Sequence, residues 1–342
     1  MPCSFDAVLL IAFGGPGGRD DIRPFLANVL RGRRVTPERV EEVVHHYEIF
    51  DGVSPITELT MRQAGALREA LAAGAAGVPV YVGMRNWHPY LRDTLAQMSR
   101  EGVRRAVGVI DAAHRSYSSC TQYRENVADA RRALREAGLA DVEVTYVDDW
   151  HLASGFIDAN ADHVLAALGS LPEDVRAEAQ LVFTAHSIPV TMAQRYPYQR
   201  QLEESCAAVA AEVAARNPHP ALRAPHPASR TPHPALVFQS RSGRPEDPWL
   251  EPDVCDYLAE TAAAGARAVV LCPVGFVCDH IEVLYDLDIE ARDAANRLGL
   301  PLARAAAVND HPRFVDALAS AVLTTIQRYA KGRALPLVPV TV

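Results

Sequence analysis

The sequence lacks several features that would assign it to broad classes of protein. Its 342 residues contain no apolar run long enough to span a bilayer. The first residues, MPCSFDAVLLIAFGG, have neither the basic region nor the small-residue cleavage site of a signal peptide. Basic residues are fewer than acidic ones, with 34 Lys and Arg against 42 Asp and Glu, and they do not cluster into a basic stripe. We therefore expect a cytoplasmic protein with no membrane anchor and no nucleic-acid partner.

Cysteine is scarce as well. Six cysteines occur, at positions 3, 120, 206, 255, 272 and 278, and no two of them form a CxxC pair. A cytosolic chain of this size rarely contains disulfides, so we interpret these residues as buried thiols.

What the sequence does contain is a regular alternation of apolar runs with amphipathic, alanine-rich stretches. Strands are predicted at 5–13, 79–85, 105–112, 142–148, 180–185, 235–240, 267–274 and 301–307, with helices between them. Continuous apolar strands separated by helices indicate parallel sheets that are covered on both faces. The predicted fold is α/β, with two similar Rossmann-like domains, each a parallel sheet flanked by helices, and an active-site cleft between them.

The two series of strands predict domains at 1–152 and 153–310, with a C-terminal helix at 311–330 packed on the first. A proline-rich insert at 217–236 repeats PHPA three times and carries the histidines at 219, 226 and 233. Proline excludes a regular helix or central strand there, and zinc-binding histidines are usually held closer together on ordered elements. We interpret the insert as a surface loop; weak metal binding by its histidines is the alternative.

Two motifs in the second half carry candidate chemistry. In CPVGFVCDHIEVLYDLDIEA, residues 272–291, Glu282, Asp286 and Glu290 are four apart, which on a helix places them on nearly one face. Such a face is either a solvated acidic surface or a row of oxygen ligands for a divalent cation. In LVFTAHSIP, residues 181–189, His186 directly follows a strand, where α/β folds bind ligands. We expect the histidine and the acidic helix to face one cleft.

These motifs, with LIAFGGPGG, DGVSPI, YVGMRNWHPY, YSSCTQYREN and VFQSRSGRPEDPWLEPDV, resemble those of ferrochelatases. They occur in the order of that family and cover nearly the whole chain. The sequence is most similar to the actinobacterial branch, whose members insert Fe²⁺ into coproporphyrin III, giving coproheme in heme biosynthesis. The resemblance therefore implies a lyase that forms nitrogen–metal bonds.

The resemblance also implies roles for individual residues. His186 and Glu282 match the catalytic, metal-binding pair, and Asp286 with Glu290 match a possible path for the metal. Ser54 and Tyr123 match positions that contact the porphyrin, whereas Tyr47 and Arg31 lie in segments that hold propionates. The role of His114 stays open between metal entry and a surface or capping position. Fe²⁺ and coproporphyrin III are then substrates, no cofactor is bound permanently, and a coproheme decarboxylase is a possible downstream partner.

Two positions depart from the patterns of relatives. Phe13 stands where many Gram-positive relatives have an iron-ligating tyrosine, so no such oxygen–iron bond can form. Many actinobacterial relatives bind a [2Fe–2S] cluster through one mid-chain cysteine and three near the C-terminus. Cys120 matches the first of these, but no cysteine follows Cys278, so we predict no iron–sulfur cluster.

Other functions remain as alternatives at this point. The nearest is ferrochelatase activity on protoporphyrin IX, which has vinyl groups where coproporphyrin has two further propionates. A cobalt or nickel chelatase is a second, although those chains are usually shorter and lack the QSRSG…PWLEP segment. A non-catalytic heme or metal carrier, with the PHPA loop as a metal store, is a third.

Overall fold

The computed structural model describes residues 5–32, 35–74, 77–217, 235–242 and 247–332. The histidines of the PHPA repeat, at 219, 226 and 233, lie outside the described residues. The chain divides into two compact units. Unit 1 comprises residues 1–111, 120–150 and 312–342, and unit 2 comprises residues 112–119 and 151–311.

Each unit contains a four-stranded parallel sheet. The strands are β1 (Ala7–Ala12), β2 (Val80–Met84), β3 (Arg105–Ile110), β4 (Glu143–Tyr146), β5 (Gln180–His186), β6 (Ala235–Gln239), β7 (Val269–Cys272) and β8 (Leu302–Arg304). The first sheet has the order β2-β1-β3-β4 and the second β6-β5-β7-β8, so both sheets follow the same scheme. In both, the strand order reverses beside the first strand of the series, and ligands of open α/β sheets bind outside the strand ends at this switch point.

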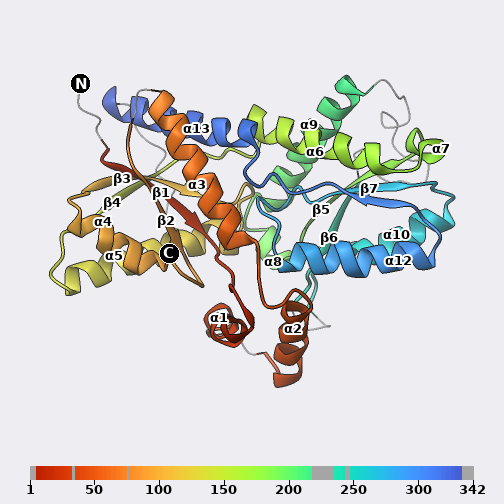
Figure 1. The fold of residues 1–342 in the computed structure, drawn as a ribbon, viewed down its shortest axis with the longest axis horizontal. Helices are drawn as coiled ribbons and strands as arrows, with labels where there is room; N and C mark the ends of the chain where they lie inside the picture. Colours follow the sequence, from red (N-terminus) through yellow and green to blue (C-terminus); the bar gives the residue numbers. More distant parts are fainter. Residues whose placement is uncertain (1–4, 33–34, 75–76, 218–234, 243–246, 333–342) are drawn as a thin grey trace. The chain divides into compact units, whose positions relative to one another are not determined.

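Helices cover both faces of each sheet (Figure 1). The helices of unit 1 are α1 (Ile22–Val29), α2 (Pro37–Ile49), α3 (Ile56–Ala73), α4 (Leu91–Arg100), α5 (Gln122–Glu136) and α13 (Pro312–Ala330), with the short η1 (Arg19–Asp21). Helices α3 and α13 pack together on one face of the first sheet, and α4 and α5 on the other (Figure 1). The π-helix η2 (Tyr117–Thr121) precedes α5.

Unit 2 repeats this layering. Its helices are α6 (Ser154–Ser170), α7 (Glu173–Arg176), α8 (Val190–Ala193), α9 (Tyr198–Arg216), α10 (Val254–Ala263), α11 (Ile281–Val283), the π-helix η4 (Leu284–Ala291) and α12 (Arg292–Arg297). Helices α6 and α9 pack together on one side of the sheet, and α10 and α12 on the other (Figure 1). No described helix is both long and apolar enough to cross a membrane.

The predicted fold class is confirmed for both units. Seven of the eight predicted strands contain the observed strand, and the eighth, β5, extends one residue beyond the prediction to His186. Burial explains the agreement for the central strands: β1 shows an unbroken apolar run, AVLLIA, in which every residue is buried, whereas no residue of β4 at the edge of the same sheet is fully buried.

Candidate functional site

His186 is placed by the end of a buried strand. Residues 182–185 of β5 are buried, and His186 is the last residue of the strand, at the switch point of the second sheet. The buried Tyr198 donates its hydroxyl hydrogen to the His186 carbonyl oxygen at 3.0 Å, which fixes the backbone there. The ring atom Nδ1 lies 2.5 Å from the Ser187 carbonyl oxygen. A carbonyl only accepts, so Nδ1 carries a hydrogen, and in the tautomer that this bond selects the lone pair of the ring lies on Nε2.

Glu282 follows the neighbouring strand β7. A close approach of two backbones brings this segment to the end of β5, because a Cβ at Gly275 would lie 2.5 Å from that of Ala185. The Gly275 amide donates to the Thr184 carbonyl at 3.1 Å. One carboxylate oxygen of Glu282 then lies 3.8 Å from Nε2 of His186, and the Glu282 side chain is 48% exposed. The geometry therefore brings the predicted histidine and carboxylate together in unit 2, with the carboxylate open to solvent.

His280 also lies in this group, and sequence reasoning missed it. Its Nε2 is 3.6 Å from the same oxygen of Glu282. Burial lowers the pKa of His280, so its imidazole is neutral at pH 7 and adds a third polar group without adding charge. The signal was present in the sequence, since His280 stands two residues before Glu282 in the motif CDHIE.

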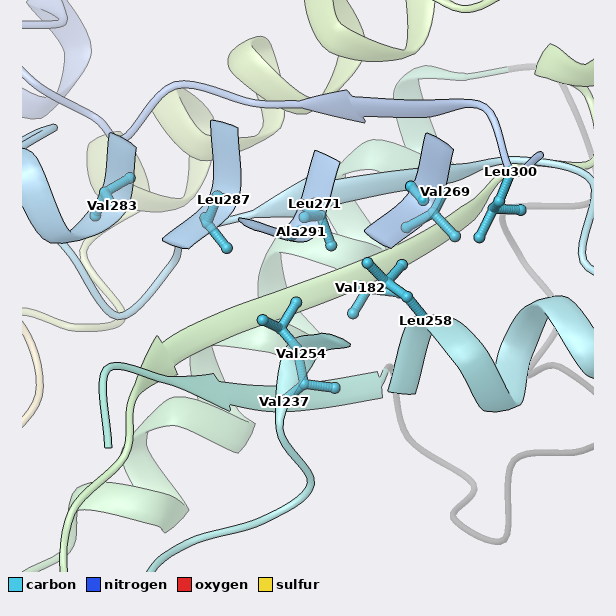
Figure 2. Packing of buried hydrophobic residues seen from close by; sticks show 11 residues of the cluster. Val182, Val237, Val254, Leu258, Val269, Leu271, Val283, Leu287, Ala291 and Leu300 are labelled. Atoms are coloured by element: carbon cyan, nitrogen blue, oxygen red, sulfur yellow. The ribbon is translucent and has the colours of Figure 1, made fainter. Parts of the chain in front are cut away.

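The acidic segment is helical as predicted, but its central part is a π-helix. Helices α11, η4 and α12 run without interruption from Ile281 to Arg297. Its apolar residues Val283, Leu287 and Ala291 are fully buried in a cluster with residues of the sheet, including Val182 and Leu271 (Figure 2). The acids Glu282, Asp286 and Glu290 each precede one of these buried residues, so they form a row beside the buried ridge.

Asp286 lies in the middle of this acidic row and is hydrogen-bonded. The Ser240 hydroxyl donates to Asp286 Oδ2, and the Gln239 side-chain amide donates to the same oxygen at 3.2 Å. Burial raises the pKa of Asp286 to about 7, and the nearby charges of Glu282 and Glu290 act in the same direction. Near neutral pH this carboxyl group therefore exchanges a proton readily. Glu290, the next acid of the row, is exposed.

The residues predicted to contact a porphyrin lie in unit 1. Ser54 is buried where the loop after β1 meets the start of α3, and its amide donates to the Pro16 carbonyl at 2.9 Å. Glycine is required at this contact, because a Cβ at Gly15 would lie 2.7 Å from the Ser54 and Ile56 side chains. The Thr57 hydroxyl stabilises the contact between the loop and α3 by accepting a hydrogen bond from the Gly15 amide at 3.1 Å. The glycine-rich loop thus positions Ser54 at the switch point of the first sheet.

Tyr47 and Tyr123 are both buried, and each is linked through one further side chain to Phe13, the residue that follows β1. The Tyr47 ring packs on Phe25, with 5.7 Å between centroids, and Phe25 packs edge-on against Phe13 at 6.2 Å. The guanidinium of Arg85 lies 4.6 Å from the Tyr123 ring centroid and 5.8 Å from that of Phe13. Arg85 is a further cation at this aromatic group, and sequence reasoning missed it although it stands in the quoted motif YVGMRNWHPY.

Two remaining predicted residues lie apart from these groups. Arg31 follows α1, is exposed, and donates to the Asn28 side-chain oxygen at 2.7 Å. His114 is only 2% exposed, which excludes a surface role, and its Nε2 lies 2.9 Å from the Ser205 hydroxyl oxygen. Burial, with a smaller contribution from His151, lowers the pKa of His114 to about 3. The His114 imidazole is therefore neutral near pH 7.

The cysteines of the described residues give a first testable prediction, the absence of an iron–sulfur cluster. Cys206 and Cys272 are fully buried, and burial raises the pKa of both thiols; burial also raises the pKa of Cys255 to about 12. The ligands of an iron–sulfur cluster are thiolates, whereas these environments favour the protonated thiol. Protein purified anaerobically should contain no stoichiometric acid-labile sulfide. One sulfide-containing cluster per chain would contradict the prediction.

Within the part of the chain that the structure describes, no three or more His, Cys, Asp and Glu side chains are grouped so that they could hold a metal ion. At His186 the groups instead form pairs that share one Glu282 oxygen, which lies 3.8 Å from Nε2 of His186 and 3.6 Å from Nε2 of His280, beside a row of acids. Such a pair can contact a hydrated divalent cation and accept a proton.

Comparison with known proteins gives a family. The model of the ferrochelatase family matches residues 5–326. The coproporphyrin III ferrochelatase of Streptomyces griseus is 48% identical over 94% of this chain and 86% of its own length. That of Streptomyces coelicolor is 46% identical over 93% of this chain and 85% of its own length. A ferrochelatase of Rhodopirellula baltica is 43% identical over the same shares, 93% and 85%.

Solved structures agree on the fold. The sirohydrochlorin chelatase SirB from Bacillus subtilis subspecies spizizenii, in complex with cobalt, has a TM-score of 0.50 and 11% identity. SirB from Bacillus subtilis with Fe³⁺ has a TM-score of 0.54 and 10% identity. Each comparison covers 96% of this chain and 99% of the other. At such low identity these structures support a chelatase-type fold and nothing more.

Proposed function

The chain belongs to the ferrochelatase family, and we propose that it inserts Fe²⁺ into coproporphyrin III to form coproheme. The single observation that carries the proposal is the pair at the switch point of the second sheet, where His186 Nε2 and a Glu282 oxygen lie 3.8 Å apart. The relatives named coproporphyrin III ferrochelatases, which are 48% and 46% identical, support this substrate. Protoporphyrin IX is the alternative substrate, since the relative from Rhodopirellula baltica is named only a ferrochelatase.

The chemistry of the insertion fits the groups in unit 2. Replacing two pyrrole hydrogens by Fe²⁺ releases two protons and requires that iron lose water ligands. We assign to His186 Nε2, whose lone pair is available, the acceptance of a pyrrole proton and contact with iron. Glu282, half exposed, receives the hydrated ion, and its negative charge offsets that of the metal. Asp286, with a pKa of about 7, is suited to pass protons outward to Glu290 and to receive iron from it.

In unit 1 we propose that Ser54, Tyr47 and Tyr123 contact the porphyrin and that Arg31 pairs with a propionate. The hydroxyl groups and the aromatic faces suit a flat macrocycle with acidic arms, and a guanidinium binds a carboxylate through paired hydrogen bonds. The binding energy would hold the porphyrin bent, which exposes its nitrogen lone pairs to iron. On this proposal iron is a substrate and not a resident cofactor. The enzyme works in the cytoplasm, and a coproheme decarboxylase would consume its product.

An assay of the two porphyrins tests the proposal. Purified protein, Fe²⁺ under anaerobic conditions and either coproporphyrin III or protoporphyrin IX are mixed, and metallation is followed by absorbance. We expect many turnovers and a higher kcat/KM with coproporphyrin III. A higher kcat/KM with protoporphyrin IX would favour the alternative substrate. Binding of one porphyrin or iron per chain without turnover would instead indicate a carrier.

The PHPA repeat gives a second testable prediction. Deleting residues 219–233 should leave the rate of iron insertion within a few-fold of the parent, provided a short connection remains between Asn217, which follows α9, and Ala235, which begins β6. Closure entropy varies slowly with loop length, by about 0.6 kcal/mol per doubling. If the histidines gathered iron, the deletion would raise the Fe²⁺ concentration needed for half-maximal rate. A triple His→Ala variant at 219, 226 and 233 would then show the same defect.

A further inference from the structure

We propose that Arg304 is a positioning residue for iron insertion, holding both ends of the segment 279–288 so that Glu282 stays opposite His186. The inference rests on the proposed function, because it takes Glu282 as the iron-binding carboxylate. Arg304 forms its ion pairs with Asp279 and Asp288, which flank Glu282 in the sequence. Its effect on Glu282 would therefore be exerted through the backbone that carries Glu282.

Arg304 contacts two carboxylates of one segment. It is the last residue of β8, where it pairs with Leu271 of β7, and its side chain is 13% exposed. Its Nη1 donates to Asp279 at 2.9 Å, and its Nε donates to Asp288 at 2.8 Å. Burial disfavours the charged guanidinium, yet Asp288 and Asp279 together raise the pKa of Arg304 above its ordinary value. The cation is therefore held between the two acids.

Asp279 binds both β8 and the segment that follows it. Besides Arg304, it accepts from the Asn309 side-chain amide at 2.9 Å and from the Ala307 amide at 3.3 Å. Its own backbone amide donates to the Asn309 side-chain oxygen at 2.8 Å. Asp279 thus ties the loop after β7 to the segment after β8. Asp288 also accepts from Arg292, at 3.4 Å.

Glu282 and Asp286 lie in sequence between these two anchors. The acids of the segment therefore separate into two sets with different partners: Asp279 and Asp288 bind Arg304, while Glu282 and Asp286 lie near His186 and Ser240. Close packing of the buried apolar neighbours resists movement of the helix. The two charge-assisted ion pairs at the ends of the segment add directional restraints on its position. A misplacement of about 1 Å at a reacting group can cost about 100-fold in rate.

The test uses Arg304→Gln, Arg304→Lys and Asp288→Asn, with Arg216→Gln as the matched control. Arg216 lies in the same unit and forms ion pairs with Asp162 and Glu212, away from the segment 279–288. Four quantities are measured for each variant: kcat, KM for Fe²⁺, porphyrin affinity by fluorescence quenching, and thermal midpoint. The absorption of Co²⁺ added to porphyrin-free protein reports the geometry of the metal-binding groups without turnover.

For Arg304→Gln we expect kcat to fall by about 10- to 100-fold, with porphyrin affinity within about twofold of the parent. The Co²⁺ spectrum should change. Arg304→Lys keeps the charge but not the forked geometry, so its kcat should lie between those of Arg304→Gln and the parent. Asp288→Asn removes one anchor and should lower kcat by about tenfold, which decides the matter if Arg304→Gln does not fold. Arg216→Gln should keep parental kcat even where its thermal midpoint falls.

The inference is overturned if Arg304→Gln, or Asp288→Asn in its place, retains parental kcat and the parental Co²⁺ spectrum. It is equally overturned if Arg216→Gln loses the same fraction of kcat, since the loss would then follow general destabilisation. Failure of the proposed function looks different, because the parent protein itself would then insert no iron, whereas failure of the Glu282 assignment alone would leave Glu282→Gln fully active. Loss of activity in Glu282→Gln with none in the Arg304 and Asp288 variants rejects the positioning role alone.

Discussion

Replacing His186 by alanine is expected to abolish iron insertion while the porphyrin still binds. The substitution removes the imidazole whose Nε2 faces Glu282 at 3.8 Å, and no backbone group can replace its lone pair. General acid–base catalysis alone is worth about 10²–10⁴-fold, and loss of an iron contact adds to this. Stopped-flow absorbance at saturating coproporphyrin III and Fe²⁺ measures the loss, and fluorescence quenching measures porphyrin affinity.

A suitable control for His186 is His163→Ala. His163 lies on α6 of the same unit, and its ring Nδ1 is 3.1 Å from the Ala306 carbonyl oxygen. This variant should keep parental turnover. Near-normal turnover in His186→Ala would instead reject the assignment of His186 as proton acceptor and iron contact.

Replacing Glu282 by glutamine is expected to lower turnover by about 100-fold or more. The amide has nearly the same volume, so packing is unchanged, but the negative charge beside His186 and His280 is lost. A neutral amide oxygen binds a hydrated divalent cation more weakly than a carboxylate does. We therefore expect a higher KM for Fe²⁺ as well as a lower kcat, both measured by anaerobic absorbance assays.

Glu260→Gln provides the comparison for Glu282. Glu260 is an exposed acid on α10, and its substitution changes the same net charge at a different place. It should leave both constants unchanged. An unchanged rate in Glu282→Gln would mean that another carboxylate of the acidic row, Asp286 or Glu290, binds the hydrated iron.

Central strands such as β1 and β7 were predictable because every residue in them is buried. A strand such as β1 has no residue that faces solvent, so its sequence is an uninterrupted apolar run that local pattern alone identifies. Helix α2 has no such marked pattern, since only Val44 and Tyr47 among its residues are buried. Its start could still have been recognised, because Thr36 caps it by accepting from the Arg39 amide and Pro37 begins it.

The candidate site was predictable only in part, for a related reason. Spacing of four identified the acidic row, but spacing cannot show which acids face which partner. That division depends on Arg304, which comes from β8, and on Ser240, which follows β6. Neither the ion pairs of Arg304 nor the hydrogen bond of Ser240 can be recognised from the residue spacing within the segment 279–288. The proximity of His280 to Glu282 likewise depends on the path of the loop after β7, which Gly275 permits.

The π-helix η4 gives the acidic segment a surplus of roughly one residue over an α-helical course with the same total rotation. A π-helix takes more residues per turn than an α-helix, and α11 and α12 continue it on both sides. Deleting one residue from Leu284–Ala291 would let the segment become α-helical while the residues after it rotate by much less than the roughly 100° per residue of an α-helix. Ala291 and Ala295 would then stay on the side that faces the core. Homologous chains that are one residue shorter here should therefore have a continuous α-helix and keep the same buried positions.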